Sequence, residues 1–314
     1  MDRVLTTVPT IDIHEFASLG RPASEVAEKL ECAFRQYGFF SLVGHGVSTS
    51  VIDDAFAASR RFFDQPTQEK MLSTPSDGFL GYRGLGTLRA STRNAQSSPD
   101  MKETFSLGPD SSHGLHSSAS AASTNIWPAG VPELRPALVA YYESMASLAL
   151  KLTDIISVAL GLPAESLRNR SDRQLSWLAS INYPPTVDAR PGQMRFGEHR
   201  DRNCVTILSA TGDGLEVQDI SGQWHQVPTR PYTFLVNAGR MLADWVGGRW
   251  TAAQHRVCNP AGAARRQSLV YFFNPNPETP LDPLCGRSDG QQPESSRTVI
   301  TVGDYLKSML DLYR

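Results

Sequence analysis

The sequence predicts an α+β chain with a mainly β core, a double-stranded β-helix or cupin-like jelly roll, flanked by N-terminal helices and a C-terminal helix. The first half carries apolar residues at helical spacing. Residues 175–274 instead contain eight short segments with β-branched or aromatic residues, separated by turns. Eight strands are what a double-stranded β-helix requires.

Helical periodicity predicts helices over residues 24–37, 48–63, 131–161 and 301–313. Ser24 is a suitable N-cap for the first helix, and Gly38 follows its last apolar position. The longest of these helices has one broad apolar face, as expected for a helix that packs against a sheet. Short strands are predicted before the β core at residues 9–13, 39–43 and 100–107.

The eight core strands are predicted in a fixed order along the chain. Their residues are 175–183, 193–199, 204–209, 214–219, 223–227, 233–237, 254–258 and 268–274. No linker interrupts the pattern, so we interpret residues 1–314 as a single domain. Within it we distinguish an N-terminal helical and substrate-lid region (1–125), a supporting helix (126–170), the jelly-roll catalytic core (171–280) and a C-terminal capping segment (281–314).

Composition excludes several classes of protein. The formal net charge is −2, with 30 Lys and Arg against 32 Asp and Glu, so no basic excess predicts nucleic-acid binding. No apolar run is long enough to span a membrane, and the N-terminus has no apolar core of signal-peptide length. The four cysteines are scattered without metal or disulfide spacing, which predicts reduced thiols and a cytoplasmic location.

The segment at residues 192–201 organises the functional interpretation. His199 and Asp201 end a predicted strand, and a second histidine, His255, lies far downstream. Residues i and i+2 of a strand point to the same face, so His199 and Asp201 can hold one ion together. Two imidazoles and one carboxylate suit non-haem Fe(II) with about three open coordination positions.

A second pattern follows the distal histidine. Arg266 and Ser268 open an apolar predicted strand, and their spacing places both side chains on one strand face. A guanidinium beside a hydroxyl is a good receptor for a carboxylate. The sequence therefore predicts a binding site for an acidic small molecule near the metal.

With these patterns in order, the chain resembles the Fe(II)/2-oxoglutarate-dependent dioxygenases of the isopenicillin N synthase-like family. The resemblance covers nearly the whole chain. Its further motifs are residues 8–13 (VPTIDI), 37–47 (YGFFSLVGHGV), 81–84 (GYRG), 102–105 (KETF), 183–185 (YPP) and 303–306 (GDYL). The family's usual Asn-Tyr-Tyr-Pro corresponds to residues 181–184 with Ile181 in the asparagine position, so only Tyr183 is carried over.

This resemblance implies the cofactors and the reaction. Fe(II) would be held by the two histidines and the aspartate, and the co-substrate 2-oxoglutarate by Arg266, Ser268 and Tyr183. O₂ would be the second co-substrate, with succinate released while an unactivated C–H of a small organic substrate is hydroxylated, desaturated or drawn into a ring rearrangement. The resemblance also implies secondary-metabolite biosynthesis. We expect a monomer or a weak homo-oligomer.

Candidate substrate contacts are less specific than the metal ligands. Arg195 lies four residues before His199, so it is either a pocket residue or one partner of a structural salt bridge. In the resembled family the Gly-rich region 73–98 covers the mouth of the active site. That makes Tyr82, Arg83 and Arg89 candidates, with solvated loop residues as the alternative. Phe105 could line the pocket or pack in the core.

Three other functions remain open from the sequence. An Fe(II) oxidase of the isopenicillin N synthase type would use O₂ without 2-oxoglutarate, and would not need Arg266 and Ser268. A non-catalytic jelly-roll binding protein would carry a metal site that has lost its function. Zinc hydrolysis uses similar ligands, but no general base stands beside the predicted triad. Succinate formation separates the first alternative from the preferred interpretation.

Overall fold

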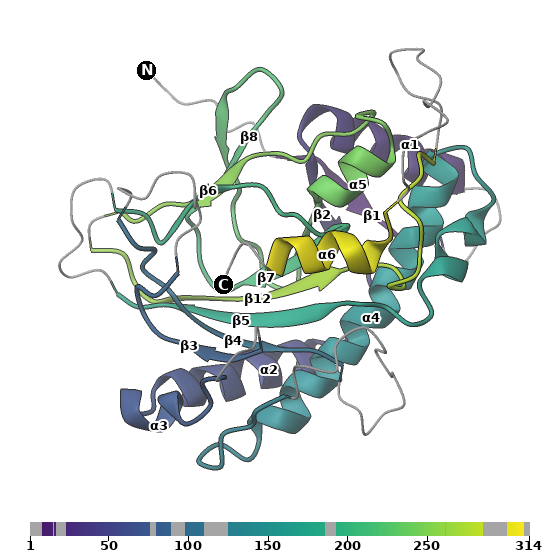
Figure 1. Cartoon of the computed structure of the whole chain (residues 1–314). Helices are drawn as coiled ribbons and strands as arrows, with labels where there is room; N and C mark the ends of the chain where they lie inside the picture. Colours follow the sequence, from purple (N-terminus) through teal and green to yellow (C-terminus); the bar gives the residue numbers. More distant parts are fainter. Residues whose placement is uncertain are drawn as a thin grey trace, which may run out of the picture.

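The computed structural model describes residues 8–14, 16, 23–75, 80–88, 98–109, 125–185, 193–260, 262–284 and 300–310. Two β-sheets form the centre of the molecule, and helices cover the larger sheet on the side away from the smaller one (Figure 1). This arrangement is the predicted α+β jelly roll. No described helix has both the length and the apolar character that crossing a membrane requires.

The larger sheet has eight strands and extends the jelly roll with N-terminal strands on both edges. Every pairing in it is antiparallel except that of its first two strands. In sheet order its members are β1 (Thr10–Asp12), β2 (Phe39–Val43), β10 (Phe234–Ala238), β7 (Val205–Ala210), β12 (Arg266–Phe273), β5 (Trp177–Tyr183), β4 (Glu103–Leu107) and β3 (Gly81–Arg83).

The smaller sheet has four strands, in the order β6 (Phe196–His199), β11 (His255–Val257), β8 (Leu215–Gln218) and β9 (Trp224–Gln226). Strands β5 to β12 are the eight strands predicted for the core, and they divide equally between the two sheets. Each lies within about three residues of its predicted bounds. The spacing of turns and apolar residues therefore located the whole β core.

The helices are α1 (Ala23–Gln36), α2 (Thr49–Phe63), α3 (Thr67–Met71), α4 (Leu134–Ala159), α5 (Arg240–Trp245) and α6 (Val302–Leu310), with 3₁₀ turns at Ala164–Ser166 and Arg168–Arg170. The long helices match the sequence predictions. Helix α5 was not predicted, because six residues are too few to establish a 3.6-residue period.

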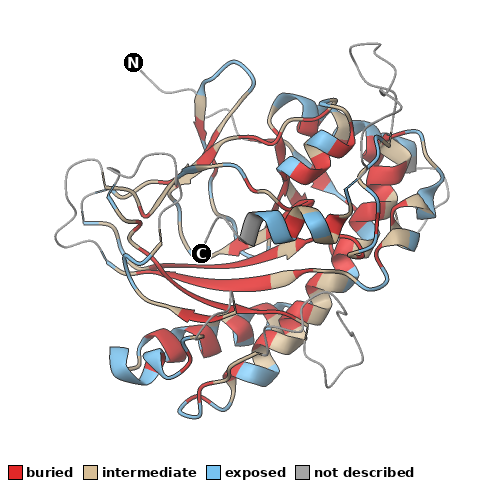
Figure 2. Ribbon diagram, in the orientation of Figure 1, coloured by how far each residue is buried: buried red, intermediate tan, exposed pale blue. Residues whose placement is uncertain are grey.

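Helix α4 and the outer face of the larger sheet enclose the main hydrophobic core (Figure 2). The apolar residues of α4 recur at three- and four-residue intervals, so one stripe of the helix is buried along its whole length. The helix ends where Gly161 adopts a φ of +75°, and Leu162 donates to the carbonyl of Ser157 at 2.9 Å. Those two features form a Schellman motif, in which glycine tolerates the left-handed conformation.

A second cluster of buried side chains lies between the two sheets. Alternate residues of β5 and β12 point into it, among them Ile181, Tyr183 and Val270, and Val217 and Val257 reach it from the smaller sheet. Because strand side chains alternate, Arg266 and Ser268 share the inward face of Val270. The interior of the jelly roll therefore receives residues from both sheets.

Candidate metal centre and co-substrate site

The three predicted metal ligands meet at one place. His199 ends β6 and His255 opens β11, and the two histidines are directly opposed in an antiparallel pair. Each Nε2 atom lies 3.7 Å from Oδ1 of Asp201. One ligand atom from each residue falls within 4.8 Å of the others, so a single ion can contact all three. We call His199, Asp201 and His255 the metal triad.

Backbone carbonyls orient both imidazoles. Nδ1 of His199 lies 2.8 Å from the carbonyl oxygen of Gly197, and Nδ1 of His255 lies 3.2 Å from that of Ala253. A proton on Nδ1 donates to the carbonyl and leaves the Nε2 lone pair facing Asp201. Burial, and then the neighbouring His255, lowers the pKa of His199 to about 3, so this imidazole is neutral at physiological pH.

Two side chains fix the carboxylate of Asp201. Its Oδ2 accepts hydrogen bonds from Thr206 Oγ1 at 2.6 Å and Asn237 Nδ2 at 2.8 Å, which leaves Oδ1 for the histidines. Burial opposes ionisation, but both histidines and these hydrogen bonds outweigh it and lower the pKa of Asp201. Neither Thr206 nor Asn237 was identified from the sequence, although both lie on predicted strands.

The backbone around Asp201 is held by the turn that starts helix α5. The amide of Arg240 donates to the carbonyl of Asp201 at 2.7 Å, and that of Gly239 donates to Cys204 at 2.9 Å. A Cβ on Gly239 would collide with the carbonyl oxygen of Asn203. The unpredicted helix therefore contributes directly to the position of the carboxylate ligand.

This donor set fits the implied iron. A metal ion needs neutral imidazole and ionised carboxylate ligands, and the lowered pKa values of His199 and Asp201 favour those states. Two histidines and one carboxylate on one side of an ion leave positions for a chelating co-substrate and O₂, as in non-haem Fe(II) oxygenases. The remaining ring nitrogens and the second carboxylate oxygen are already hydrogen-bonded, as expected for a preorganised site.

Arg266, Ser268 and Tyr183 form the second part of the site, which we call the co-substrate clamp. Arg266 pairs with Tyr183 across β12 and β5, and its guanidinium lies 4.9 Å from the tyrosine ring. Nε donates to the carbonyl of Gly212 at 2.9 Å, and Nη1 lies 3.4 Å from Ser268 Oγ. Arg266 is 2% exposed, and within the described residues no carboxylate comes within 4.0 Å of it.

A buried guanidinium stays charged, because its intrinsic pKa is very high, even though burial lowers the pKa of Arg266. Its bonds to a carbonyl and a hydroxyl do not neutralise that charge. An incoming carboxylate would supply both the missing charge and further hydrogen-bond acceptors. The clamp is therefore suited to the distal carboxylate of a 2-oxo acid.

Arg195 is buried next to this clamp. Its Nη2 donates to the carbonyls of Pro184 at 3.2 Å, Ala263 at 3.4 Å, and Ala264. Burial, and then repulsion from Arg266, lowers the pKa of Arg195. Arg195 forms no salt bridge with any described acidic residue, so that alternative from the sequence is not observed. Its hydrogen bonds instead connect Pro184, which follows Tyr183, to Ala263 and Ala264, which precede Arg266.

Two predicted substrate contacts lie elsewhere. Tyr82 and Phe105 are cross-strand partners on β3 and β4, and both pack in the main core against Phe62 of α2. Tyr82 is 2% exposed and donates to Glu103 at 2.6 Å. Their strand face looks away from the interior of the jelly roll, so they do not join the triad.

Arg83 is placed differently. It pairs with Thr104, and this pair lies on the face of β3 and β4 opposite to Tyr82 and Phe105. Arg83 is half-buried and remains a candidate for the pocket. Arg89, the other predicted contact of this region, lies outside the described residues.

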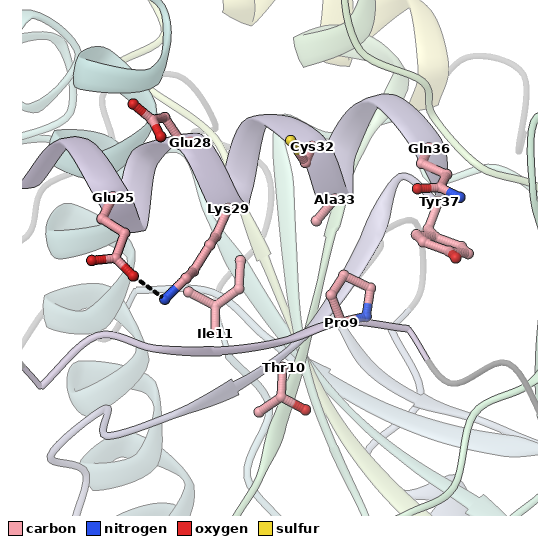
Figure 3. Close-up of a pocket in the computed structure, with 10 residues that line it drawn as sticks. All are labelled: Pro9, Thr10, Ile11, Glu25, Glu28, Lys29, Cys32, Ala33, Gln36 and Tyr37. Carbon is pink, nitrogen blue, oxygen red and sulfur yellow. Dashed lines mark ion pairs between the residues drawn. The ribbon is translucent and has the colours of Figure 1, made fainter.

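A surface groove of about 550 Å³ lies between β1 and α1 and shares no residue with the triad or the clamp (Figure 3). Glu25, Glu28, Lys29 and Cys32 of the helix line one wall, and an ion pair of 2.7 Å joins Lys29 to Glu25. The chemistry predicted from the sequence therefore lies in the jelly roll and not in this groove.

A jelly roll that holds two histidines and an aspartate at one point, facing a buried arginine, defines the mononuclear non-haem iron class of oxygenases. Comparison with known proteins identifies the family. The family model described as the N-terminal region of non-haem dioxygenases in morphine synthesis matches residues 8–130. The model of the 2OG-Fe(II) oxygenase superfamily matches residues 165–275, which contain the triad and the clamp.

Two relatives are similar to this chain in sequence over most of their lengths. Validamycin A dioxygenase of Streptomyces hygroscopicus subsp. limoneus is 33% identical, covering 90% of this chain and 81% of its own. The 2-oxoglutarate-dependent dioxygenase tropC of Talaromyces stipitatus is 32% identical, covering 96% of this chain and 97% of its own. The chain therefore belongs to the 2-oxoglutarate-dependent dioxygenases, and it is an enzyme whose cofactor is Fe(II) and whose co-substrates are 2-oxoglutarate and O₂.

Solved structures share the fold. The full-length T7H of Neurospora crassa in complex with alpha-KG superposes with a TM-score of 0.84 at 23% identity, covering 100% of this chain and 98% of that one. A 2OG-Fe(II) oxygenase family protein of Caulobacter crescentus gives a TM-score of 0.84 at 25% identity, covering 97% and 98%. The predicted jelly-roll class is thereby confirmed.

Proposed function

We propose that His199, Asp201 and His255 are the iron ligands of this enzyme, and that Arg266, Ser268 and Tyr183 bind 2-oxoglutarate. The enzyme then oxidises an unactivated C–H of a small organic molecule. The observation that carries this assignment is the convergence of three ligand atoms within 4.8 Å, from strands that the fold pairs directly.

The chain's own groups prepare the site for this reaction. Bound Fe(II) would activate O₂, which is the oxidant: two of its four electrons would come from 2-oxoglutarate, released as succinate and CO₂, and two from the substrate. Gly197 and Ala253 orient the imidazoles, and Thr206 and Asn237 hold the carboxylate. Arg266 fixes the far end of the co-substrate, and burial between the sheets excludes water from the reacting atoms.

Anaerobic titration tests the assignment. Fe(II) followed by 2-oxoglutarate should produce the metal-to-ligand charge-transfer band of a chelated 2-oxo acid, saturating at one equivalent of each. Asp201→Ala should show no such band. An enzyme that formed the same band without Asp201 would have its iron elsewhere. Release of succinate on admitting O₂ separates this function from that of a 2-oxoglutarate-independent oxidase.

The substrate class and setting are also proposals. The balanced charge of the chain and the similarity to Validamycin A dioxygenase support a small-molecule substrate in secondary metabolism. The scattered cysteines support a cytoplasmic location, and within the described residues Cys204 is buried. We further propose a monomer or weak homo-oligomer of one domain, which light scattering over a range of protein concentrations would test.

A further inference from the structure

Two buried lysines flank strand β4 and differ in how their charges are satisfied. Lys70 donates to Glu103 Oε2 at 2.7 Å and to the carbonyl of Phe63 at 3.1 Å. Among the described residues, the acidic group nearest to Lys102 is Asp100, whose Oδ2 lies 3.7 Å from Nζ, beyond hydrogen-bond distance. Both side chains are less than a tenth exposed, at 8% and 5%. Lys70 thus has the partners that a buried ammonium requires, whereas Lys102 is under-satisfied.

Lys102 lies on the pocket side of β4. Continuing the alternation of this strand by one residue places it on the face of Thr104, opposite to Phe105. Its Nζ atom lies over the ring of Phe196, 2.7 Å from the centroid. That ring stacks on His199, with centroids 3.8 Å apart and an interplanar angle of 20°. The ammonium is therefore one aromatic ring away from a metal ligand.

The electrostatics agree with this placement. Burial is the main influence on Lys102 and lowers its pKa to about 7, while Asp100 and Asp201 act in the opposite direction. Lys102 in turn contributes to the low pKa of His199. Asp100 also accepts a hydrogen bond from the amide of Gly197 at 2.9 Å, so its carboxylate is shared with the backbone of β6. Lys102 thus retains donor capacity beside the triad.

We propose that Lys102 is a substrate-recognition residue that pairs with an anionic oxygen of the substrate, in the first instance a carboxylate. This inference rests on the proposed function, because it assumes that the triad and the clamp form the catalytic pocket. The inference narrows the proposed substrates from small organic molecules in general to small organic acids.

The charge balance of the pocket supports an anion. The buried charged groups of the described residues around the triad are Lys102, Arg195 and Arg266 against Asp100 and Asp201. Arg83 is only half-buried and would add to the positive side of this balance. Asp213 also acts on Arg266, but it is exposed and its charge is screened by solvent. Divalent iron and dianionic 2-oxoglutarate would cancel each other, leaving one uncompensated positive charge. A monoanionic substrate would neutralise it.

The test compares acids with their uncharged counterparts. The probes are benzoate, phenylacetate and cyclohexanecarboxylate, each paired with its primary carboxamide, added to the anaerobic Fe(II)·2-oxoglutarate enzyme. Binding is followed by the change in the charge-transfer band and by the rise in Tm. We expect at least one acid to bind about tenfold or more tightly than its amide, the scale of a hydrogen bond to a charged group.

Three variants assign that preference to the side chain. Lys102→Met should remove the preference for the acid, and Lys102→Arg should retain most of it. Asp100→Asn keeps an acceptor for Gly197 but removes the competing charge, so acids should bind several-fold more tightly. This gain cannot arise from misfolding, so the proposal stays testable even where Lys102→Met is unstable.

Two results would overturn the proposal. In the first, the wild-type enzyme binds no acid more tightly than the corresponding amide. In the second, Lys102→Met prefers acids over amides as strongly as the wild type does. Either can occur with a normal charge-transfer band from Fe(II) and 2-oxoglutarate. Failure of the proposed function would instead abolish that band before any probe is added. The two failures are therefore distinguishable.

Discussion

The two sheets of the jelly roll hold the two parts of the site by different means. In the smaller sheet, His199 and His255 lie on strands of only four and three residues, with side chains 14% and 9% exposed. In the larger sheet, Arg266 and Tyr183 lie on strands of eight and seven residues and are 2% and 1% exposed. The metal triad lies on short strands and is somewhat less buried than the clamp, which is part of a core.

This difference indicates what determines each geometry. Short strands bury little apolar surface, so the triad depends on specific hydrogen bonds to Gly197, Ala253, Thr206 and Asn237. The clamp depends on packing between β5, β12 and β7, whose registers are continuous. Changes in the triad should therefore affect metal affinity first, and changes in the clamp should affect co-substrate affinity.

The largest expected effect comes from removing a metal ligand. Asp201→Ala or His255→Ala should leave no measurable turnover and should weaken Fe(II) binding, because each removes one of the three protein donors that the described residues bring together. Calorimetric Fe(II) titration under anaerobic conditions measures the second effect.

Another acid–histidine pair in the same sheet supplies a matched control. Asp219 lies 2.7 Å from Nε2 of His225 at the turn between β8 and β9. Asp219→Ala should bind Fe(II) with wild-type affinity, because Val217 of β8 separates His225 from His255 and neither Asp219 nor His225 is one of the three donors. Equal loss of iron in Asp201→Ala and Asp219→Ala would indicate that the sheet, not the ligand set, had been damaged.

The clamp should respond in co-substrate affinity. Arg266→Ala should raise the KM for 2-oxoglutarate about 10- to 100-fold, the range expected for hydrogen bonds between charged groups. The adjacent Arg265 contacts Asn182 and Asp64 on the other face of β12, so Arg265→Ala should change this KM by less than about threefold. If Arg266→Ala raised the KM for substrate as much as the KM for 2-oxoglutarate, the role of Arg266 would be structural and not specific to the co-substrate.

A smaller effect tests the hydrogen bonds that hold the carboxylate. Asn237→Leu and Thr206→Val each leave Asp201 Oδ2 with one donor in place of two. Loss of such an outer partner typically weakens metal binding about 10- to 100-fold. Competition with a chelator of known affinity would measure it. Unchanged iron affinity in both variants would mean that packing alone positions Asp201.

The β core and most of the ligand set could be predicted because strands have a period of two. That period predicted that His199 and Asp201 share one strand face, and that Arg266 and Ser268 share another. The turns in the sequence predicted where the strands end. Which long-range pairs form is not encoded locally. The meeting of β6 with β11 came instead from the family resemblance, whose implied ligand set the geometry now supports.

The pocket walls were predicted poorly for a physical reason. Strand β4 is buried on both faces, so its sequence contains no alternation that distinguishes the pocket side from the α2 side. The sequence therefore left both the pocket and the core open for Phe105, which packs in the core, and Lys102 was not considered as a pocket residue. Helix α5 was missed because it is too short, although its first turn holds the backbone of Asp201.

The smallest effect concerns the far end of the smaller sheet. Burial opposes ionisation of Asp219, but hydrogen bonds from Ser221, His225 and the amide of Gln223 outweigh it and lower its pKa to about 2. A depressed carboxyl pKa stabilises the folded state above the ordinary value near 3.8, and this contribution is lost as pH falls toward 2. Asp219→Asn should therefore cost roughly 1 kcal/mol at pH 7, the scale of a surface hydrogen bond.

Urea unfolding of the metal-free protein at pH 7, 5 and 3 measures that difference. The gap between wild type and Asp219→Asn should be constant from pH 7 to 5 and should shrink at pH 3. A gap of the same size at all three values would mean that the geometry of the turn, not the charge of Asp219, stabilises it. Because Asp219 is not a triad residue and strand β8 lies between its partner His225 and His255, Asp219→Asn should not alter iron affinity. This result would separate the stability of the smaller sheet from the geometry of the metal ligands.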